Sequence, residues 1–406
     1  MLELAGRFVV ALWHVLGLLL VLVLLVEFIP SAYRRMSRWL RYRRSDRPDS
    51  AALADAQAGA DWAVGYFDEF GRAVRVDWRA YVGWWQRPYR GAYITLDHRG
   101  LRPTPGEERS APGTIRIMCF GGSTMMGMGA RDSRTIPALL AVRLGELGYR
   151  VALTNYGQLG HNSTQELITL QEALRAGIRF EIALFYDGLN DMLTAEQTGH
   201  AGAMWNEQRR RAEFNLLLDE RRRDLLLAAF LRAIPQTVRR LRRLTGASLR
   251  GPLPEPEADL SGVDLSRLAV EILDVYAGNQ RMVRLLAAEY GFRPIFYWQP
   301  VITTKQIKSP DEQRFEADHT RDVEARRVLS RAVIAEYRRR TTIADGDLID
   351  LSALFDDVST PVYIDMMHLS EAGNLTVAEA IVPSLTALLD AFIPPAESVA
   401  RSEHGA

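Results

Sequence analysis

Residues Thr114 to Gly129 read TIRIMCFGGSTMMGMG, a short apolar run followed by two glycines, a serine and a threonine. The apolar run is typical of a buried strand. Gly121 and Gly122 permit a sharp turn after it, because residues without a Cβ tolerate backbone conformations that others avoid. Ser123 is therefore predicted at the entry to a helix, where free backbone N–H groups favour a developing negative charge. A strand, a tight turn and a helix in this order indicate an α/β protein.

The same alternation continues along the chain. Apolar runs predict five strands, at Thr114–Phe120, Arg150–Tyr156, Phe180–Tyr186, Arg293–Trp298 and Asp347–Leu351. Helical patterns lie between and after them, near Ile136–Leu147, Thr164–Ala176, Leu265–Tyr290, Arg321–Arg340 and Glu371–Ala391. Strands that alternate with helices predict βαβ units, and hence a parallel sheet covered by helices.

The composition excludes several classes of protein. The chain has 406 residues, of which 25% are charged and 48% apolar, as in ordinary folded proteins. Its formal net charge is zero, so we expect no nucleic-acid partner. Cys119 is the single cysteine, which excludes a disulfide framework and a cysteine-based metal cluster. The only lysines are Lys305 and Lys308, and we attribute the preference for arginine to genome composition.

The N-terminus contains a long apolar segment. Phe8 to Pro30 is almost purely apolar and long enough to cross a hydrocarbon core of ~30 Å as a helix. It exceeds the apolar core of a typical signal peptide, and no convincing small-x-small cleavage site follows it. We therefore expect residues 1–30 to be a transmembrane anchor that makes the membrane a partner of this chain. Seven arginines follow the span and one precedes it, which by the positive-inside rule places the remaining chain in the cytoplasm.

Composition divides the rest of the chain into segments. Residues 31–60 are a basic juxtamembrane segment and linker, and residues 61–112 are rich in aromatics. Because those aromatics show no regular period, we expect an irregular strap that packs on the main domain. The main domain covers residues 113–393 and contains an Arg-rich helical insertion at about 192–262. We expect the insertion to be a solvated cap, with a membrane-surface or substrate-gating lid as the alternative. Residues 394–406 are expected to be a disordered tail.

Polar residues follow three further apolar runs. Ligands bind at the carboxyl ends of the strands in open parallel sheets. The segment Asn155–Ser163 follows the second predicted strand, and Asp187–Asp191 follows the third. A glycine N–H and an asparagine amide at such neighbouring ends can both donate to an oxyanion. Asp365 and His368 lie just before the last helix, and an Asp at this spacing can orient a His towards a serine.

Other kinds of site fit the same residues poorly. A phosphate-binding loop requires a lysine before Ser123, and a dinucleotide-binding loop requires a third glycine where Asp132 stands. Met125 occupies the second glycine position of the G-x-S-x-G elbow. A metal site at Asp365 and His368 requires further ligands, which the seven histidines do not supply at ligand spacing. We expect neither a metal nor a cofactor.

Together the four segments resemble the SGNH, or GDSL-like, hydrolase family, which is named for a Ser, a Gly, an Asn and a His in separate blocks. The resemblance covers roughly residues 114–391. It implies a three-layer α/β/α fold with a flavodoxin-like, parallel, five-stranded sheet, here with an N-terminal transmembrane helix and a helical insertion. By position, Ser123 matches the nucleophile, and Asp365 and His368 match the rest of the triad. The backbone of Ser123, Gly160 and the Asn190 amide match the oxyanion donors.

The resemblance implies a serine hydrolase that acts on carbohydrate O-acyl or lipid esters through an acyl-serine. The alternatives are an O-acyltransferase with the same site, and a non-catalytic scaffold in a membrane or polysaccharide complex. This chain departs from the family at its first block, which reads Gly-Gly-Ser-Thr in place of Gly-Asp-Ser-Leu. Gly157 is a rival to Gly160 as the backbone donor.

Two further expectations concern the substrate and the location. Flexible methionines near the site can line an adaptable acyl pocket, and the candidates are Met125, Met126, Met192, Met366 and Met367. Ordinary filling of the core is the alternative. Anchored members of the family often act outside the cytoplasm on glycans or lipids. The resemblance therefore favours an extracytoplasmic domain, against the arginines after the span.

Overall fold

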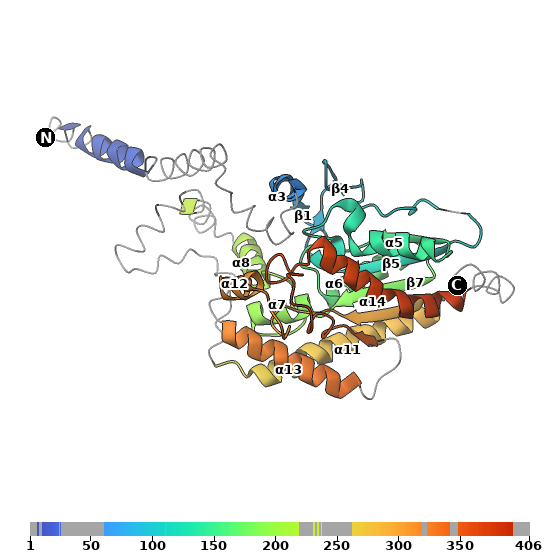
Figure 1. The fold of residues 1–406 in the computed structure, drawn as a ribbon. Coiled ribbons are helices and arrows are strands. Elements are labelled where there is room, and N and C mark those ends of the chain that lie inside the picture. The colour runs from blue at the N-terminus through green and yellow to red at the C-terminus, as the bar shows by residue number, and fades with distance from the viewer. Residues whose placement is uncertain are drawn as a thin grey trace. The chain divides into compact units, whose positions relative to one another are not determined.

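Five parallel strands form the central sheet, in the order β6 (Val151–Asn155), β5 (Ile115–Gly121), β7 (Ile182–Asp187), β8 (Arg293–Trp298) and β9 (Leu348–Asp350). Numbered along the chain, this order is 2-1-3-4-5, the flavodoxin-like arrangement. Helices flank the sheet (Figure 1). The predicted fold class is confirmed, and the five predicted strands agree with the observed ones to within two residues at each end.

The computed structural model describes residues 6–7, 10–23, 25, 61–109, 111–218, 230–231, 234, 237, 262–318, 323–341 and 348–392. The chain divides into two compact units. One comprises Met1–Asp49 and Asn206–Pro256, and the other comprises Ser50–Trp205 and Glu257–Ala406. The sheet and every predicted site residue belong to the second unit. The expected linker (31–60), most of the expected insertion and the expected tail (394–406) lie outside the described residues.

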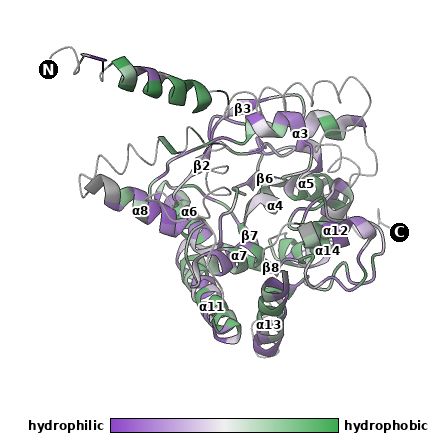
Figure 2. Ribbon diagram, turned by 90° about the vertical axis from the view of Figure 1, so that its left-hand side faces the viewer, coloured by the Kyte–Doolittle hydropathy of each residue, from purple (hydrophilic) through white to green (hydrophobic). Residues whose placement is uncertain are grey.

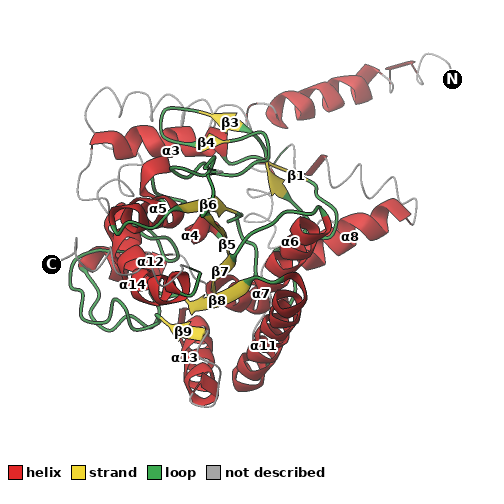
Figure 3. Cartoon of the chain, turned by 90° about the vertical axis from the view of Figure 1, so that its right-hand side faces the viewer, coloured by secondary structure: helices red, strands yellow, loops and turns green. Residues whose placement is uncertain are grey.

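Helices cover both faces of the sheet, because alternate strand residues point to opposite sides. On one face, α5 (Ile136–Glu146) and α14 (Glu371–Asp390) pack over Ile117 and Cys119. On the other, the helices are α6 (Ser163–Arg175), α7 (Leu189–Thr198), α11 (Leu265–Tyr290) and α13 (Val323–Thr341). Figure 3 shows α5 and α14 on one side of the strands and α6 and α11 on the other.

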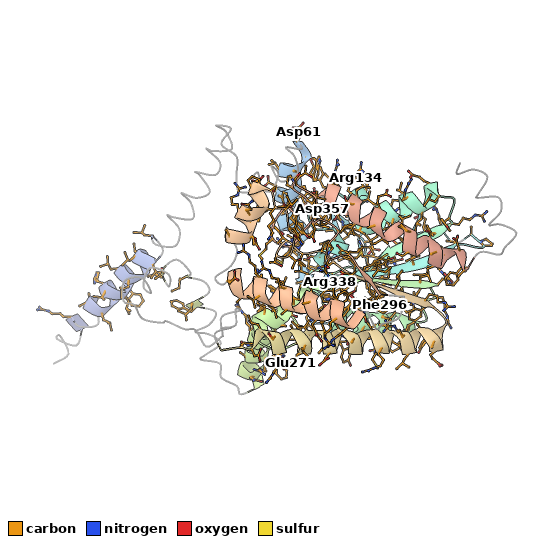
Figure 4. All side chains as sticks on the ribbon, turned by 60° about the horizontal axis from the view of Figure 1, so that its bottom comes forward. Asp61, Arg134, Glu271, Phe296, Arg338 and Asp357 are labelled. Atoms are coloured by element: carbon orange, nitrogen blue, oxygen red, sulfur yellow. The ribbon has the colours of Figure 1, made fainter. Side chains whose placement is uncertain are left out.

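An aromatic ladder crosses the second face of the sheet. Phe120, Phe185 and Phe296 are register partners on β5, β7 and β8. Their rings stack at centroid distances of 4.8 and 5.1 Å. Phe296 is buried between the sheet and its helices, whereas Arg338 is exposed on α13 (Figure 4). The stacked rings pack the strands together below the loops that follow β5 and β7.

The aromatic segment before the sheet is more regular than predicted. It contains α3 (Asp61–Ala73) and two short antiparallel pairs, β1 (Val76–Asp77) with β2 (Trp85–Gln86) and β3 (Tyr89–Arg90) with β4 (Thr95–Leu96). The prediction of an irregular strap is therefore wrong over α3. Its aromatics at 62, 66 and 70 have helical i, i+4 spacing, and Tyr66 contacts Trp62 and Phe70 at centroid distances of 5.9 and 6.0 Å.

Two apolar helices bear on the expected membrane anchor. The helix Val10–Val23 lies within the predicted span and is mostly hydrophobic (Figure 2). Among the described helices, α14 is the one long and apolar enough to cross a membrane. However, α14 packs on α5 and contributes Val377, Ile381 and Leu385 to the core, so it is a core helix. The anchor at residues 1–30 stays a prediction.

The first residues of the expected insertion belong to the main domain, because they lie in helix α7. Helix α7 packs on α11 and α13 around Met192 and Leu193. Helix α8 (Glu207–Leu218) belongs to the other unit. The short helix α4 (Ser123–Met126) begins at the serine, as predicted, and α12 (Pro310–Asp318) is a helix that the sequence patterns did not predict. Both lie within the unit that contains the sheet.

Candidate active site

Ser123 is the first residue of α4, directly after β5 and the turn at Gly122. The turn is crowded, because a Cβ on Gly122 would lie 1.9 Å from the Asn190 amide nitrogen. A Cβ on Gly157 would similarly lie 2.3 Å from the backbone nitrogen of Met126 on α4. Both glycines therefore let neighbouring strand-end loops approach the serine closely. The Gly-Gly-Ser-Thr block follows from this packing, since a larger residue at 122 would displace Asn190.

Three side chains form a continuous hydrogen-bonded chain at the serine. His368 Nε2 lies 2.7 Å from Ser123 Oγ, and His368 Nδ1 lies 2.7 Å from Asp365 Oδ2. The second carboxylate oxygen of Asp365 accepts the backbone N–H groups of Met367 and His368, each at 2.7 Å. The aspartate therefore holds one tautomer and orientation of the imidazole, with its other nitrogen towards the serine.

The electrostatics of Asp365 favour its ionised form. Burial by itself raises the pKa of this carboxyl. The adjacent His368 and the two backbone N–H donors outweigh that effect, so the pKa of Asp365 lies below its usual value. Asp365 can thus supply a fixed negative charge to stabilise an imidazolium.

A tight loop presents Asp365 and His368 together. The Ile364 N–H donates to the carbonyl of His368 at 2.9 Å, and the Ser370 N–H donates to that of Val362 at 2.8 Å. Ser370 then begins α14, where its hydroxyl accepts the N–H of Gly373. The paired base of the loop fixes Asp365 and His368 relative to the sheet.

Asn190 lies at the start of α7, beside the serine. Its Nδ2 donates to the carbonyl of His161 at 2.7 Å, which orients the amide and leaves its second hydrogen available. Gly188, with φ +113°, precedes this helix, and a Cβ there would meet the Trp298 ring at 2.7 Å. The glycine thus allows α7 to begin directly over the end of β8.

The glycines at 157 and 160 differ in the state of their N–H groups. The Gly157 N–H donates to Asn155 Oδ1 at 2.9 Å, and Gly157 is buried. Gly160 has φ +64° and is partly exposed, and its N–H has no acceptor among the described residues. This contrast favours Gly160 over Gly157 as the backbone donor. The Ser123 N–H likewise has no acceptor among the residues that the structure describes.

The aromatic strap holds the loop that carries Gly160, a contact that the sequence patterns did not predict. Trp84 Nε1 donates to the carbonyl of Leu159 at 2.7 Å, and His161 Nε2 lies 3.1 Å from the Trp84 carbonyl. Burial lowers the pKa of His161 to about 4, so this imidazole is neutral and structural. The Gln86 N–H also donates to Gln158 Oε1 at 3.0 Å.

Three carboxyl groups are buried behind Asn190. They belong to Glu166 on α6, Asp187 at the end of β7 and Asp191 on α7. Burial raises the pKa of Asp187 to about 7 and that of Asp191 to about 6, and it also raises the pKa of Glu166. Asp191 accepts the hydroxyl of Ser163 at 2.5 Å. The sequence placed two of these acids beside Asn190 but carried no signal for the third.

A narrow pocket, with about 10 Å³ of space for a water-sized molecule, adjoins α7 and the loop between Asp365 and His368. Its lining comprises Leu189, Met192, Leu193, Glu196, Val301, Thr303, Arg326, Leu329, Ser330, Met366 and Met367. Three of the five predicted pocket methionines are therefore in its wall. The other two, Met125 and Met126, are buried and do not line it.

Comparison with known proteins gives only weak likenesses. No protein-family model matches the chain, and a search of curated proteins finds no match. One similar solved structure is a member of the lipolytic protein G-D-S-L family from Veillonella parvula DSM 2008, with 12% identity, 67% of this chain and 98% of that chain covered, and a TM-score of 0.34. Another is the acetyl xylan esterase AlAXEase, with 13% identity, coverage of 66% and 99%, and a TM-score of 0.36.

A third similar structure is Axe2, an acetylxylan esterase from Geobacillus stearothermophilus, with 12% identity, coverage of 66% and 93%, and a TM-score of 0.33. These structural neighbours are lipolytic hydrolases and acetyl xylan esterases. Because the scores are low, the chemistry proposed for this chain rests on the geometry of Ser123, His368 and Asp365.

Proposed function

We propose that the protein hydrolyses ester bonds through an acyl-serine intermediate formed on Ser123. The observation that carries the proposal is the chain of two 2.7 Å contacts from Ser123 Oγ through His368 to Asp365. A serine is a weak nucleophile unless an adjacent base accepts its proton. Residues 245 apart in the sequence make this contact at the carboxyl end of the sheet, where ligands bind in such folds.

The steps follow from the positions of the groups. As Ser123 Oγ attacks the ester carbonyl carbon, its proton passes to His368 Nε2. The tetrahedral intermediate collapses, the alcohol leaves with the proton from His368, and the acyl group stays on Ser123. A water then attacks the acyl carbon, gives its proton to His368, and the carboxylic acid departs as the serine recovers its proton. Asp365 remains ionised throughout and stabilises the imidazolium.

The carbonyl oxygen becomes negative in both tetrahedral intermediates and requires donors. We assign this role to the N–H groups of Ser123 and Gly160 and to the free amide hydrogen of Asn190. Loss of one such donor typically lowers kcat by about 10²–10³. The crowding of Asn190 against Gly122 supports this assignment, because it holds the amide beside the serine.

The substrate class in this proposal is a carbohydrate O-acyl or lipid ester. We place the acyl group at the narrow pocket walled by Met192, Met366 and Met367, whose flexible side chains must move apart to admit it. Changing Met192 or Met367 to Ala is expected to shift the preferred acyl length. A change in thermal stability without any change in acyl preference would contradict the pocket. Product analysis with a sugar acceptor separates hydrolysis from acyl transfer.

The first test is labelling with a fluorophosphonate probe, which reacts with activated serines. The wild type is expected to be labelled, and Ser123→Ala and His368→Ala are expected to lose the label. Ser384→Ala is the matched control. The Ser384 hydroxyl lies 2.8 Å from the Tyr297 hydroxyl and does not contact the triad. A folded wild type that takes up no label, and cleaves no short-chain p-nitrophenyl ester, would point instead to the scaffold function.

We further propose that residues 1–30 anchor the protein and that the catalytic unit lies outside the cytoplasm. The apolar helix Val10–Val23, with Trp13 and Leu18 more than 70% exposed, supports an anchor. The arginines that follow the span oppose this orientation. Two C-terminal reporter fusions, one active only in the cytoplasm and one only outside it, decide the side. Activity of the cytoplasmic reporter alone would reverse the assignment.

A further inference from the structure

The two lysines of the chain both lie in the connection between β8 and α12. The side chain of Lys305 is 1% exposed, and that of its partner Glu312 is 0% exposed. Lys305 Nζ lies 2.8 and 2.6 Å from the two carboxylate oxygens of Glu312 and 3.4 Å from the carbonyl of Thr360. An otherwise arginine-based chain thus places an ammonium group in a fully buried ion pair.

Glu312 also accepts three backbone N–H groups. Its Oε1 accepts those of Val362 at 3.0 Å and Tyr363 at 3.3 Å, and its Oε2 accepts that of Ser309 at 2.9 Å. One carboxylate therefore ties the start of α12 to the segment that leads into the triad loop. Because these N–H groups are buried, the loss of their acceptor leaves them unsatisfied.

The tied segment is the base of the loop that holds Asp365 and His368. Val362 accepts the Ser370 N–H on the far side of the loop, and Tyr363 pairs with Leu369. The pairs Val362–Ser370 and Tyr363–Leu369 thus enclose a loop of only five residues, Ile364 to His368. A displacement of the base consequently moves His368 Nε2 relative to Ser123 Oγ, which belongs to a different strand end.

We propose that the buried Lys305–Glu312 pair is a positioning device that sets the distance between His368 and Ser123. This inference rests on the proposed serine-hydrolase function. Glu312 supplies a charged acceptor to the base of the loop, and charge-assisted bonds are shorter and stronger than neutral ones. Lys305 neutralises that charge and bonds Thr360 just before the same segment.

Stability alone is a poor explanation for the pair. Removing two charges from water costs several kcal/mol per ion, and replacing a buried ion pair by uncharged groups is often neutral or stabilising. The choice of lysine also has a geometric reason. The three N–H donors of an ammonium point in three directions from one nitrogen, here to two carboxylate oxygens and one carbonyl. The guanidinium of arginine is longer and its donors lie in one plane, so it does not match these three acceptors.

The test compares positioning with stability in the full-length protein. In the double variant Lys305→Met with Glu312→Gln, neither charge is left unpaired, and the glutamine keeps one oxygen for the Val362 N–H. We expect the melting temperature to fall only modestly, because neither charge is left unpaired although the Ser309 N–H loses its acceptor. Ester hydrolysis should show kcat reduced by about 100-fold, the effect of misplacing a reacting group by ~1 Å, with little change in KM. The low-field proton resonance of the His368–Asp365 hydrogen bond should shift or broaden.

The matched control is Glu316→Gln, one turn further along α12. Glu316 is also buried. It pairs with Lys308 at 3.0 Å and with Arg327 of α13 at 2.8 Å, and neither partner belongs to the triad loop. Its kcat is expected to stay within a few-fold of the wild type. Lys305→Arg, which keeps the charge, should lower kcat without a change in KM.

The outcomes separate the two proposals. If the wild type is neither labelled by the fluorophosphonate probe nor active on esters, the proposed function fails. If the wild type is active and the folded double variant has the same kcat and the same low-field resonance, the positioning inference is overturned. Equal loss of kcat in Glu316→Gln and in the double variant would also overturn it. If the double variant does not fold, Lys305→Arg with unchanged kcat and resonance overturns it as well.

Discussion

At the residue scale, the decisive contact is between Gly122 and Asn190. Gly122 has φ −80°, which any residue can adopt, so only space requires a glycine there. The second glycine of the Gly-Gly-Ser-Thr block therefore leaves room for the Asn190 amide, the proposed oxyanion donor. Under the proposed function, we expect a change at Gly122 to act on catalysis through the position of this amide.

Gly122→Ala is predicted to lower kcat by about 10²-fold, because its Cβ displaces the Asn190 amide from the oxyanion. Asn190→Ala should show the same loss, and the double variant should be no worse than either single change. Gly278→Ala on α11 is the control, since a Cβ there meets nothing within 4 Å. Steady-state kinetics check all four proteins. Additive losses would show that Gly122 acts independently of Asn190.

At the scale of elements, the strap between α3 and β5 completes the site although it carries no reacting group. Its Trp84 is the donor that fixes Leu159, the neighbour of Gly160. The adjacent Trp85 donates instead to the carbonyl of Arg99, within the strap itself, at 2.6 Å. Both rings pack against His161, at centroid distances of 5.5 and 5.9 Å, but only the indole N–H of Trp84 bonds the loop that carries Gly160.

Trp84→Phe is predicted to reduce kcat by roughly 5-fold, because one hydrogen bond of about 1 kcal/mol no longer holds the Gly160 loop. Trp85→Phe loses a comparable bond and should change thermal stability more than kcat. Ester hydrolysis and thermal melting of the two variants provide the comparison. A larger fall in kcat for Trp85→Phe would exclude this role for Trp84.

At the scale of the whole molecule, stability should depend on pH through the acids buried behind the site. Burial raises the pKa of Asp187 to about 7, against an ordinary value near 3.8. Between these values the folded state holds a proton that the unfolded state has released, so the free energy of unfolding falls as pH rises. The loss is complete above the folded pKa.

Asp187→Asn is therefore predicted to stabilise the protein at pH 8 relative to the wild type, and to do so less at pH 5. Removing one acid also relieves Glu166 and Asp191, whose pKa values are raised in the same site. Denaturant unfolding at several pH values measures the effect. Parallel stability curves for the two proteins would show that Asp187 does not titrate in this range.

The sequence by itself determined the elements and the layout of the candidate site. Strands and most helices follow from local apolar periodicity, and parallel strands place their carboxyl ends at one edge. The residues predicted for the triad, Ser123, Asp365 and His368, lie within hydrogen-bonding distance for that reason. The same local patterns do not predict α3, because its aromatics at 62, 66 and 70 have helical spacing but the aromatic segment as a whole has no regular period.

Only the tertiary structure decided which neighbours support the site. The preference for Gly160 over Gly157 depends on a hydrogen bond that no spacing predicts, and the contact of Trp84 with Leu159 joins residues 75 apart. The link from Glu312 to Val362 spans 50 residues. Local propensity determines secondary structure, but a partner for a buried polar group is chosen by packing among distant segments. The sequence therefore specified the proposed reacting groups, and the fold specified what holds them in place.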